Sequence, residues 1–179
     1  MFDIPSMAKG HKFYRHRTGE LSSNEEIVAF STDTRGRRIY TLRFKNLVTG
    51  KILPDKLEHV TGNHAWANDN KTVFYTRQDP ETLRSYQVYK HVLGSPVQND
   101  VLVFEEKDET FRCYVYKTKS GRFIVIGSSQ TLSDEFLLIE ADRPGDKPNI
   151  FSPRRRNLEY SIDHVDDRFL IRTNKEAPN

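Results

Sequence analysis

The chain has 179 residues, of which 36% are hydrophobic and 30% charged, enough for one domain with a hydrophobic core. Its formal net charge is only +3, from 28 Lys and Arg against 25 Asp and Glu, which argues against a nucleic-acid-binding surface. A single cysteine, Cys113, excludes an internal disulfide, and no run of 18 apolar residues is present to span a membrane.

The first 12 residues have neither the basic start nor the apolar centre of a signal peptide. We expect them to form a linker or loop. Together with the lone cysteine, this start favours a cytoplasmic protein. We expect residues 11–17 to form the first, innermost strand of the structure that follows.

A short apolar segment that ends in small or polar residues occurs four times along the chain. The residues at its centre lie 45, 51 and 45 residues apart. A fixed period in this range indicates a repeat architecture. The four central residues are Phe30, Tyr75, Ile126 and Ile171, within the segments 26–33, 72–79, 122–129 and 168–174.

Each central segment has the same neighbours along the chain. An apolar residue lies nine or ten positions earlier, across a turn rich in Asn, Asp, Ser or Gly. An alternating run typical of a half-buried strand follows, and then a shorter apolar patch. The earlier residues are Leu21, Trp66, Tyr116 and Ile162; the alternating ones are Tyr40, Leu42 and Phe44, Tyr86 and Val88, and Phe136 and Leu138; the patches are 57–60, 101–104 and 150–151.

The repeat therefore predicts four antiparallel strands in about 45–50 residues, which is typical of a β-propeller blade. We predict an all-β fold, a partial β-propeller with about three four-stranded blades and the start of another. A closed propeller has about 4–8 blades, so we expect this chain to be part of a longer one. The expected units are a linker at 1–12, blades at 13–60, 61–106 and 110–156, and an incomplete blade at 160–179.

Serine hydrolase chemistry finds little support in the sequence. Gly127, Ser128 and Ser129 are the nearest match to a Gly-x-Ser-x-Gly elbow, but Thr131 stands where the last glycine belongs. We interpret these small residues as a strand end. Neighbours on a strand, such as Asp163 and His164, point to opposite faces and pair poorly. We therefore assign no catalytic residue and leave substrate-binding residues unassigned.

Other reactive side chains also favour structural roles. We expect His64 and His164 to be hydrogen-bonded residues of innermost strands, although either could line a central tunnel. We expect Cys113 to be packed or half-exposed and Trp66 to be core rather than a stacking platform. The run 154–156 (Arg-Arg-Arg) could grip phosphate or an acidic partner, but a solvated loop between blades is the more frequent explanation.

We expect neither a metal nor a cofactor. The histidines are scattered without ligand spacing, and no carboxylate pair suggests glycoside hydrolysis. The aspartate boxes of sialidase propellers and the Trp-Asp dipeptides of scaffold propellers do not occur. The six histidines are His11, His16, His59, His64, His91 and His164.

Several blocks of the sequence are specific enough to compare with known families. They are residues 10–14 (GHKFY), 36–45 (GRRIYTLRFK), 65–69 (AWAND), 73–77 (VFYTR), 100–108 (DVLVFEEKD) and 160–164 (YSIDH). These blocks closely resemble the propeller of the oligopeptidase B (protease II) branch of the prolyl oligopeptidase family of serine peptidases. The resemblance extends from about Met7 to Asn179.

The resemblance implies a seven-bladed propeller that caps an α/β-hydrolase domain. That domain carries the catalytic Ser, Asp and His and cleaves short peptides after Arg or Lys, and the propeller excludes large folded substrates. None of the catalytic motifs falls within this sequence. The expected partners are thus the hydrolase domain of the same polypeptide and peptide substrates, with no nucleic acid and no membrane.

Two functions remain open at this stage. The first is the non-catalytic propeller portion of an oligopeptidase B-like serine peptidase. The alternative is a free-standing β-propeller-like protein-binding scaffold with no enzymatic activity. Since an open arc of blades exposes apolar surface and strand edges, we expect the isolated chain to be poorly soluble or oligomeric. We also expect it to be inactive toward arginyl and lysyl peptides.

Overall fold

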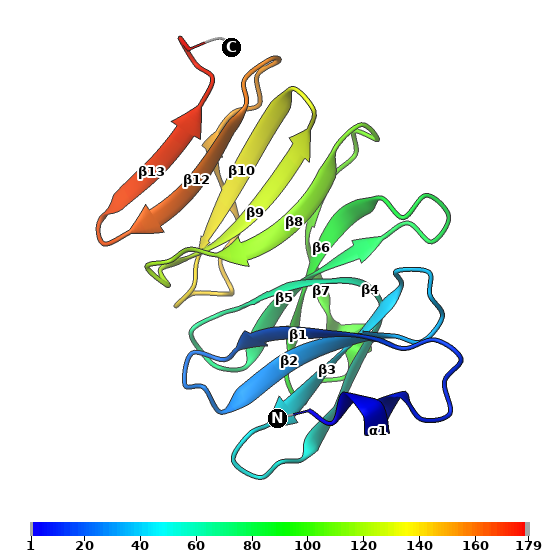
Figure 1. The fold of residues 1–179 in the computed structure, drawn as a ribbon. Coiled ribbons are helices and arrows are strands. Elements are labelled where there is room, and N and C mark those ends of the chain that lie inside the picture. Colours follow the sequence, from blue (N-terminus) through cyan, green and yellow to red (C-terminus); the bar gives the residue numbers. More distant parts are fainter. Residues whose placement is uncertain (1, 178–179) are drawn as a thin grey trace.

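The computed structural model describes residues 2–177 and is built almost entirely from antiparallel strands (Figure 1). Met1, Pro178 and Asn179, which fall in the expected linker and in the expected incomplete blade, lie outside the described residues. The strands are β1 (Arg15–Leu21), β2 (Ile27–Asp33), β3 (Tyr40–Asn46), β4 (Ile52–Trp66), β5 (Thr72–Gln78), β6 (Ser85–Val92), β7 (Val101–Glu105), β8 (Arg112–Lys117), β9 (Phe123–Gln130), β10 (Ser133–Glu140), β11 (Asn149–Ser152), β12 (Tyr160–Val165) and β13 (Arg168–Thr173).

The strands form three hydrogen-bonded sheets that follow one another through the molecule (Figure 1). Strands β1 to β7 make one sheet in sequence order, β8 to β11 a second, and β12 with β13 a third. The first sheet has seven strands because β4 pairs with β3 through its first half and with β5 through its second half. It therefore holds two blades, and the prediction of three blades plus the start of another is confirmed.

Strand β4 passes from blade one to blade two without a break. Residues 52–60 pair with β3, and residues 60–66 pair with β5. The chain bends at His59 and Gly62, which adopt φ angles of 58° and 83°. Glycine reaches this left-handed conformation without strain, so the strand changes direction and stays hydrogen-bonded. Two strands expected to meet near residue 60 are thus one continuous strand.

The hydrophobic core consists of three clusters, one at each seam between neighbouring blades. Leu42, Phe44 and Leu57 of blade one pack against Trp66 and Tyr75 of blade two. Blades two and three meet through Phe74, Val88, Ile124 and Ile139, among others, and blades three and four through Val125, Phe136, Tyr160 and Ile162.

The four central residues of the repeat differ in exposure according to their neighbours. Phe30, Tyr75 and Ile126 are fully buried, whereas 52% of Ile171 is exposed. Among the described residues, β13 pairs with β12 alone, so Ile171, which lies opposite Ile162, lacks the third strand that flanks the other central segments. Leu21 is also exposed, because β1 loses register with β2 between Thr18 and Leu21.

The N-terminal segment contains a short helix, α1 (Ile4–Ala8), in the stretch expected to be a linker or loop. The Asp3 side chain accepts a hydrogen bond from the Ser6 N–H and caps it. Phe2 packs against Phe30 with a centroid separation of 4.7 Å, so the segment covers part of blade one. The innermost strand begins at Arg15 rather than at residue 11.

Side chains of the innermost strands tie each blade to the next. The Trp66 Nε1–H donates to the Glu20 carbonyl oxygen at 3.0 Å. The Asn63 amide makes two bonds to the backbone of Val115, donating at 2.9 Å and accepting at 2.7 Å. The Tyr116 hydroxyl donates to the carbonyl of Ile162. Strands β1, β4, β8 and β12 therefore lie side by side as the innermost strands of successive blades.

Candidate functional site

A buried charged triad joins blades one and two. The two ring nitrogens of His91 on β6 contact Asp100 at 2.7 Å and Asp55 of β4 at 3.0 Å. The same Asp55 oxygen accepts from the Gly94 N–H, and the Tyr75 hydroxyl donates to the other oxygen of Asp100. All three members of the triad are almost fully inaccessible to solvent.

The triad favours the charged form of its histidine. Burial alone lowers the pKa of His91, but hydrogen bonds to Asp100 and Asp55 outweigh burial and raise this pKa above its ordinary value. Both ring nitrogens then act as donors to carboxylates. With each ring nitrogen bonded to a different carboxylate, His91 is suited to joining blades rather than to catalysis.

A second charged cluster joins blades two and three. Arg154, just after β11, contacts Glu106 at 2.5 Å and Glu135 at 3.2 Å, and its guanidinium lies 3.7 Å from the Phe111 ring centroid. The Glu106 carboxylate also accepts from Ser128. Burial raises the pKa of Glu106, but hydrogen bonds from Arg154 and Ser128 outweigh it and lower this pKa.

This cluster corrects the expected role of the arginine run. Arg154 lies between two carboxylates and an aromatic ring, so it is neither a solvated loop residue nor available for an outside phosphate. Only Arg155 and Arg156 are exposed. Arginine suits such a position because its planar head stacks on a ring while it pairs with carboxylates.

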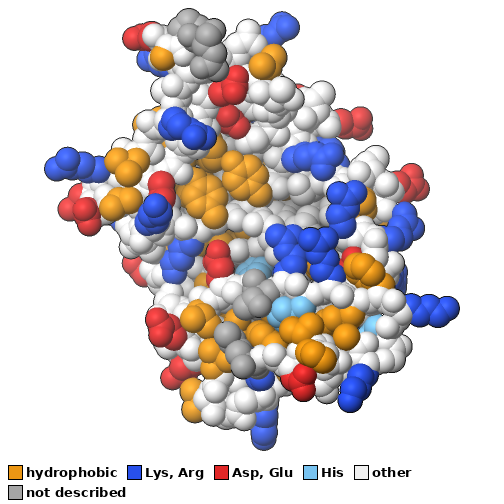
Figure 2. Space-filling model, in the orientation of Figure 1, with side chains coloured by type: hydrophobic (Ala, Val, Ile, Leu, Met, Phe, Trp, Pro, Cys, Tyr) orange, Lys and Arg blue, Asp and Glu red, His pale blue; other side chains and the backbone are white. Residues whose placement is uncertain are grey.

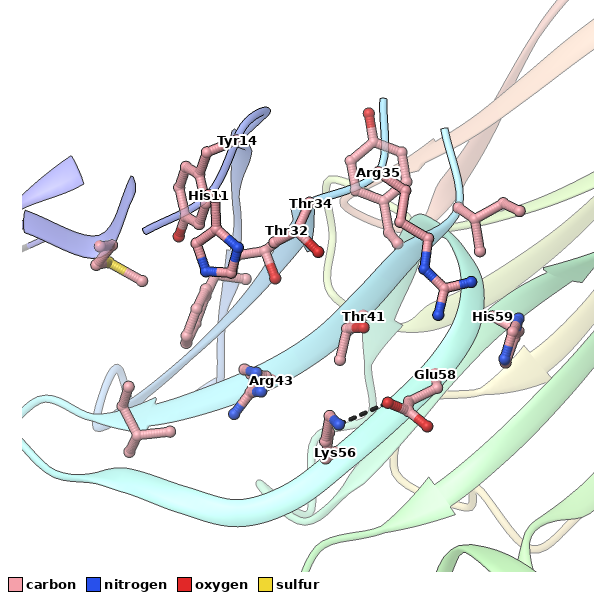
Figure 3. Close-up of a pocket in the computed structure, with 15 residues that line it drawn as sticks. His11, Tyr14, Thr32, Thr34, Arg35, Thr41, Arg43, Lys56, Glu58 and His59 are labelled. Atoms are coloured by element: carbon pink, nitrogen blue, oxygen red, sulfur yellow. Dashed lines mark ion pairs between the residues drawn. The ribbon is translucent and has the colours of Figure 1, made fainter. Parts of the chain in front are cut away.

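A hollow of about 360 Å³ lies on blade one beside α1 (Figure 3). Strand alternation places its floor on the face opposite Ala29, Leu42 and Phe44, which pack against blade two. Its walls come from the loop before β1 and from β2, β3 and β4. The labelled lining residues are His11, Tyr14, Thr32, Thr34, Arg35, Thr41, Arg43, Lys56, Glu58 and His59.

The chemistry of this hollow is that of an unpartnered blade face. Its one carboxylate, Glu58, pairs with Lys56 at 2.5 Å, and this hydrogen bond lowers the pKa of Glu58. The Tyr14 hydroxyl is buried without a hydrogen-bond partner, and burial raises its pKa. An activated hydroxyl nucleophile needs a hydrogen bond to a base such as histidine. Within the described part of the chain, no hydroxyl that lines this hollow makes such a bond.

A smaller hollow of about 300 Å³ contains four arginines, three from blade one and one from the start of blade three. Arg15 and Arg17 come from β1, Arg38 from the turn before β3, and Arg112 from the start of β8. The other lining residues are neutral. We call this group the arginine hollow. On the face seen in Figure 2, Lys and Arg side chains gather between the first and second sheets.

The small residues considered for a nucleophile are structural. Ser128 is fully buried and bonds the Glu106 carboxylate and Arg154. A Cβ on residue 127 would lie 2.4 Å from the Tyr114 ring, so only glycine leaves room for the ring there. Ser129 bonds the Tyr114 hydroxyl at 3.4 Å. No histidine contacts either serine within residues 2–177, so the structure does not assemble a triad there.

Within residues 2–177, His64 and His164 of the innermost strands are buried and hydrogen-bonded, whereas both ring nitrogens of His16 on β1 are buried without a hydrogen-bond partner. Burial lowers the pKa of His64 to about 4, so its imidazole is neutral and Nε2 can accept from the Glu20 N–H at 3.4 Å. His164 contacts the Ser120 hydroxyl at 2.9 Å. The Asp163 carboxylate accepts instead from the Lys119 and His164 backbone N–H groups. Asp163 and His164 therefore form no side-chain pair.

Cys113 and Trp66 also belong to the interior. Burial, with the nearby Glu106 carboxylate, raises the pKa of the Cys113 thiol to about 12, so it is a poor nucleophile at neutral pH. Trp66 is 1% exposed and packs edge-on against Phe44. Among residues 2–177, no group of three or more His, Cys, Asp or Glu side chains could hold a metal ion, and no helix is long and apolar enough to cross a bilayer.

Sequence reasoning missed the charged triad, the amide bridge and the arginine hollow. Asp55 is 36 residues from His91 in the sequence, and no local pattern marks Asp55, His91 or Asn63. The arginine hollow did leave a signal. Arg15, Thr61 and Arg112 occupy matching positions, one repeat apart, at the starts of three innermost strand segments.

Comparison with known proteins gives matches that extend over the chain. The sequence model of the family described as prolyl oligopeptidase, N-terminal beta-propeller domain, matches residues 1–179. Dipeptidyl aminopeptidase BI of Pseudoxanthomonas mexicana is 40% identical over 177 residues, covering 99% of this chain and 24% of that protein. Protease 2 of Moraxella lacunata is 32% identical over 181 residues, covering 100% of this chain and 26% of that protein.

Solved structures show the same arrangement of blades. Oligopeptidase B from Leishmania major superposes with a TM-score of 0.89 at 28% identity, covering 97% of this chain and 25% of that one. Oligopeptidase B from Trypanosoma brucei with covalently bound antipain gives a TM-score of 0.87 at 24% identity, covering 98% and 24%. The latter likeness concerns the fold alone. The chain spans about a quarter of the length of each of these relatives.

Proposed function

The chain belongs to the prolyl oligopeptidase family, within its N-terminal β-propeller domain, and on this premise we propose that it is the non-catalytic propeller portion of an oligopeptidase B-like serine peptidase. The peptidase cleaves short peptides after Arg or Lys. The propeller limits the size of the substrate and covers an α/β-hydrolase domain that lies outside these residues. The whole protein acts in the cytoplasm.

The observation that carries this proposal is the extent of the family match. It spans residues 1–179, loops between strands included, whereas a generic propeller would share only the strand pattern. The likeness to oligopeptidase B from Leishmania major supports the branch within the family. The chain's own side chains agree with a non-catalytic role, since Ser128 is bonded to Glu106 and His164 to Ser120.

Two measurements test the proposal. The reading frame beyond Asn179 should encode further blades and a Gly-x-Ser-x-Gly elbow, and a frame without them would leave the scaffold alternative. The polypeptide that includes the hydrolase domain should cleave a short arginyl or lysyl peptide but spare the same bond in a folded protein. Equal cleavage of both would contradict the size limit. The 179-residue chain alone should cleave neither.

A second candidate concerns the mode of cleavage. One relative, at 40% identity, is named a dipeptidyl aminopeptidase, so removal of dipeptides from the same short peptides is the competing activity. Peptides with free and acetylated N-termini distinguish the two modes. An endopeptidase cleaves both forms, whereas an aminopeptidase cleaves only the free form.

A further inference from the structure

We propose that the arginine hollow (Arg15, Arg17, Arg38 and Arg112) binds the carboxylate of a peptide at one mouth of the propeller's central channel. This inference rests on the proposed function, because it assigns peptides as the molecules that reach the channel. It adds a binding site on the propeller itself, at the ends of innermost strands.

The position of the hollow follows from the innermost strands. Arg15 and Arg112 are the first residues of β1 and β8, and Thr61, which also lines the hollow, lies at the bend of β4. These strands are joined across the seams by the bonds of Trp66 and Asn63 described above. Innermost strands surround the central channel of a propeller, so their matching ends meet at one of its mouths.

The framework of the hollow is held in place before any ligand arrives. The Arg38 N–H donates to the buried Asp33 carboxylate at 2.8 Å, and its carbonyl accepts from the Gln78 side chain of blade two at 2.9 Å. Arg17 lies 5.6 Å from the ring centroid of Tyr40, whose body is buried in the core. The backbone at Arg38 and the stack at Arg17 are thus positioned by neighbouring residues.

The electrostatics of the hollow favour an anion. Four guanidinium groups line it, and no carboxylate of residues 2–177 does. The turn between β5 and β6, which contributes Thr82 and Leu83 to the lining, contains the carboxylates of Asp79 and Glu81, neither of which lines the hollow. The Asp79 Oδ1 accepts from the Glu81 and Thr82 N–H groups. Like charges held together repel one another, and a carboxylate relieves that repulsion while it accepts paired hydrogen bonds from arginine.

The ligand chemistry follows from the donors and from the size of the hollow. Guanidinium groups match the planar carboxylate geometrically, and Thr61 and Gln78 offer further polar contacts. A volume of about 300 Å³ admits the end of a peptide but not a folded domain. The carboxylate can be the C-terminus of the peptide or an acidic side chain, and the probes below distinguish these sources.

Isothermal titration calorimetry on the 179-residue chain tests the proposal with three unlabelled hexapeptides of one neutral sequence. The first ends in a free carboxylate, the second in an amide, and the third in an amide with one Glu side chain. We expect at least one carboxylate peptide to bind at least about tenfold more tightly than the neutral amide. Tighter binding of the peptide with a free C-terminus identifies the C-terminal carboxylate as the ligand, and tighter binding of the Glu peptide identifies the acidic side chain. Added salt should reduce either preference.

Two pairs of substitutions locate the site. The double variant Arg17→Gln with Arg112→Gln should abolish the preference for the carboxylate peptide. A second double variant, Arg15→Gln with Arg38→Gln, should do the same, so the test still holds if one of the two variants fails to fold. The control, Arg155→Gln with Arg156→Gln, removes equal charge from exposed residues elsewhere and should keep it.

Equal binding of all three peptides, no binding of any, or equal loss in the control overturns the proposal. These results leave the length limit on cleavage untouched. Loss of that limit alone, with the carboxylate preference intact, counts against the proposed size filter rather than against this site.

Discussion

Replacing His91 with phenylalanine should be among the most damaging single changes in the chain. The imidazolium is fully buried between the carboxylates of Asp55 and Asp100, and phenylalanine leaves both without their cation. Removing one partner of a buried ion pair costs about 3–5 kcal/mol. Each carboxylate keeps a donor, from Gly94 or Tyr75, so we expect a loss near the lower limit, about 3 kcal/mol.

The pH dependence gives the sharper form of this prediction. The folded pKa of His91 is raised above its ordinary value of about 6.5. The contribution of the charged ring to stability is therefore complete below about pH 6.5 and is lost as the pH rises through the folded pKa. The difference in unfolding free energy between wild type and His91→Phe should be largest near pH 6.5 and smaller at pH 9.

Urea unfolding followed by tryptophan fluorescence measures this difference. Trp66, the only tryptophan, packs on Phe44, which in turn stacks on His91 at 6.3 Å, so the signal reports on the same seam. Curves at two protein concentrations reveal any contribution from association. His164→Phe is the matched control, since it removes one hydrogen bond to Ser120 and should cost about 1 kcal/mol. A loss below 1 kcal/mol for His91→Phe, or a difference that grows toward pH 9, would refute the reasoning.

Three further predictions concern the seams and the open end. Arg154→Met leaves Glu106 without its cation and should lower the unfolding free energy by about 2–3 kcal/mol in urea titrations. This loss is smaller than for a fully buried ion pair because Arg154 is partly exposed. An unchanged urea midpoint would contradict the prediction. Asn63→Leu removes both hydrogen bonds to Val115 of the neighbouring innermost strand and should cost about 2–4 kcal/mol by the same assay. A loss under about 0.5 kcal/mol, which is typical of a surface substitution, would show that these bonds do not join the blades. Leu170 and Ile171 are 57% and 52% exposed on β13, so the wild-type chain should self-associate in sedimentation velocity and Leu170→Lys with Ile171→Lys should reduce this; a sharp wild-type monomer boundary would show the opposite.

The repeat was predictable from sequence because its signals are local. The spacing of Phe30, Tyr75 and Ile126 and the alternation of Tyr40, Leu42 and Phe44 come from strand periodicity and turn chemistry, which act over a few residues. The continuous β4 was not predictable by the same means. Its bend depends on backbone angles at His59 and Gly62, and Gly62 by itself resembles an ordinary turn residue.

The charged clusters were beyond sequence reasoning for a different physical reason. Asp55 reaches the His91–Asp100 pair of blade two only after blades one and two have packed, and polar residues in strands resemble surface positions in a sequence. Arg154 resembled its two exposed neighbours because the sequence did not show that Glu106, from the preceding blade, would reach it. The repeat does align the starts of the innermost strands, so Arg15 and Arg112 could have been paired by position.

The unbroken strand β4 also sets how the arc can deform. A loop between two blades acts as a hinge, whereas a continuous strand that pairs with β3 through one half and with β5 through the other transmits force along its length and resists bending. Blades one and two should therefore move as one rigid unit, which the contact between Asp55 of blade one and His91 of blade two reinforces. Blade three follows this unit through residues 106–111, which belong to no strand, so we expect any opening of the arc to concentrate there.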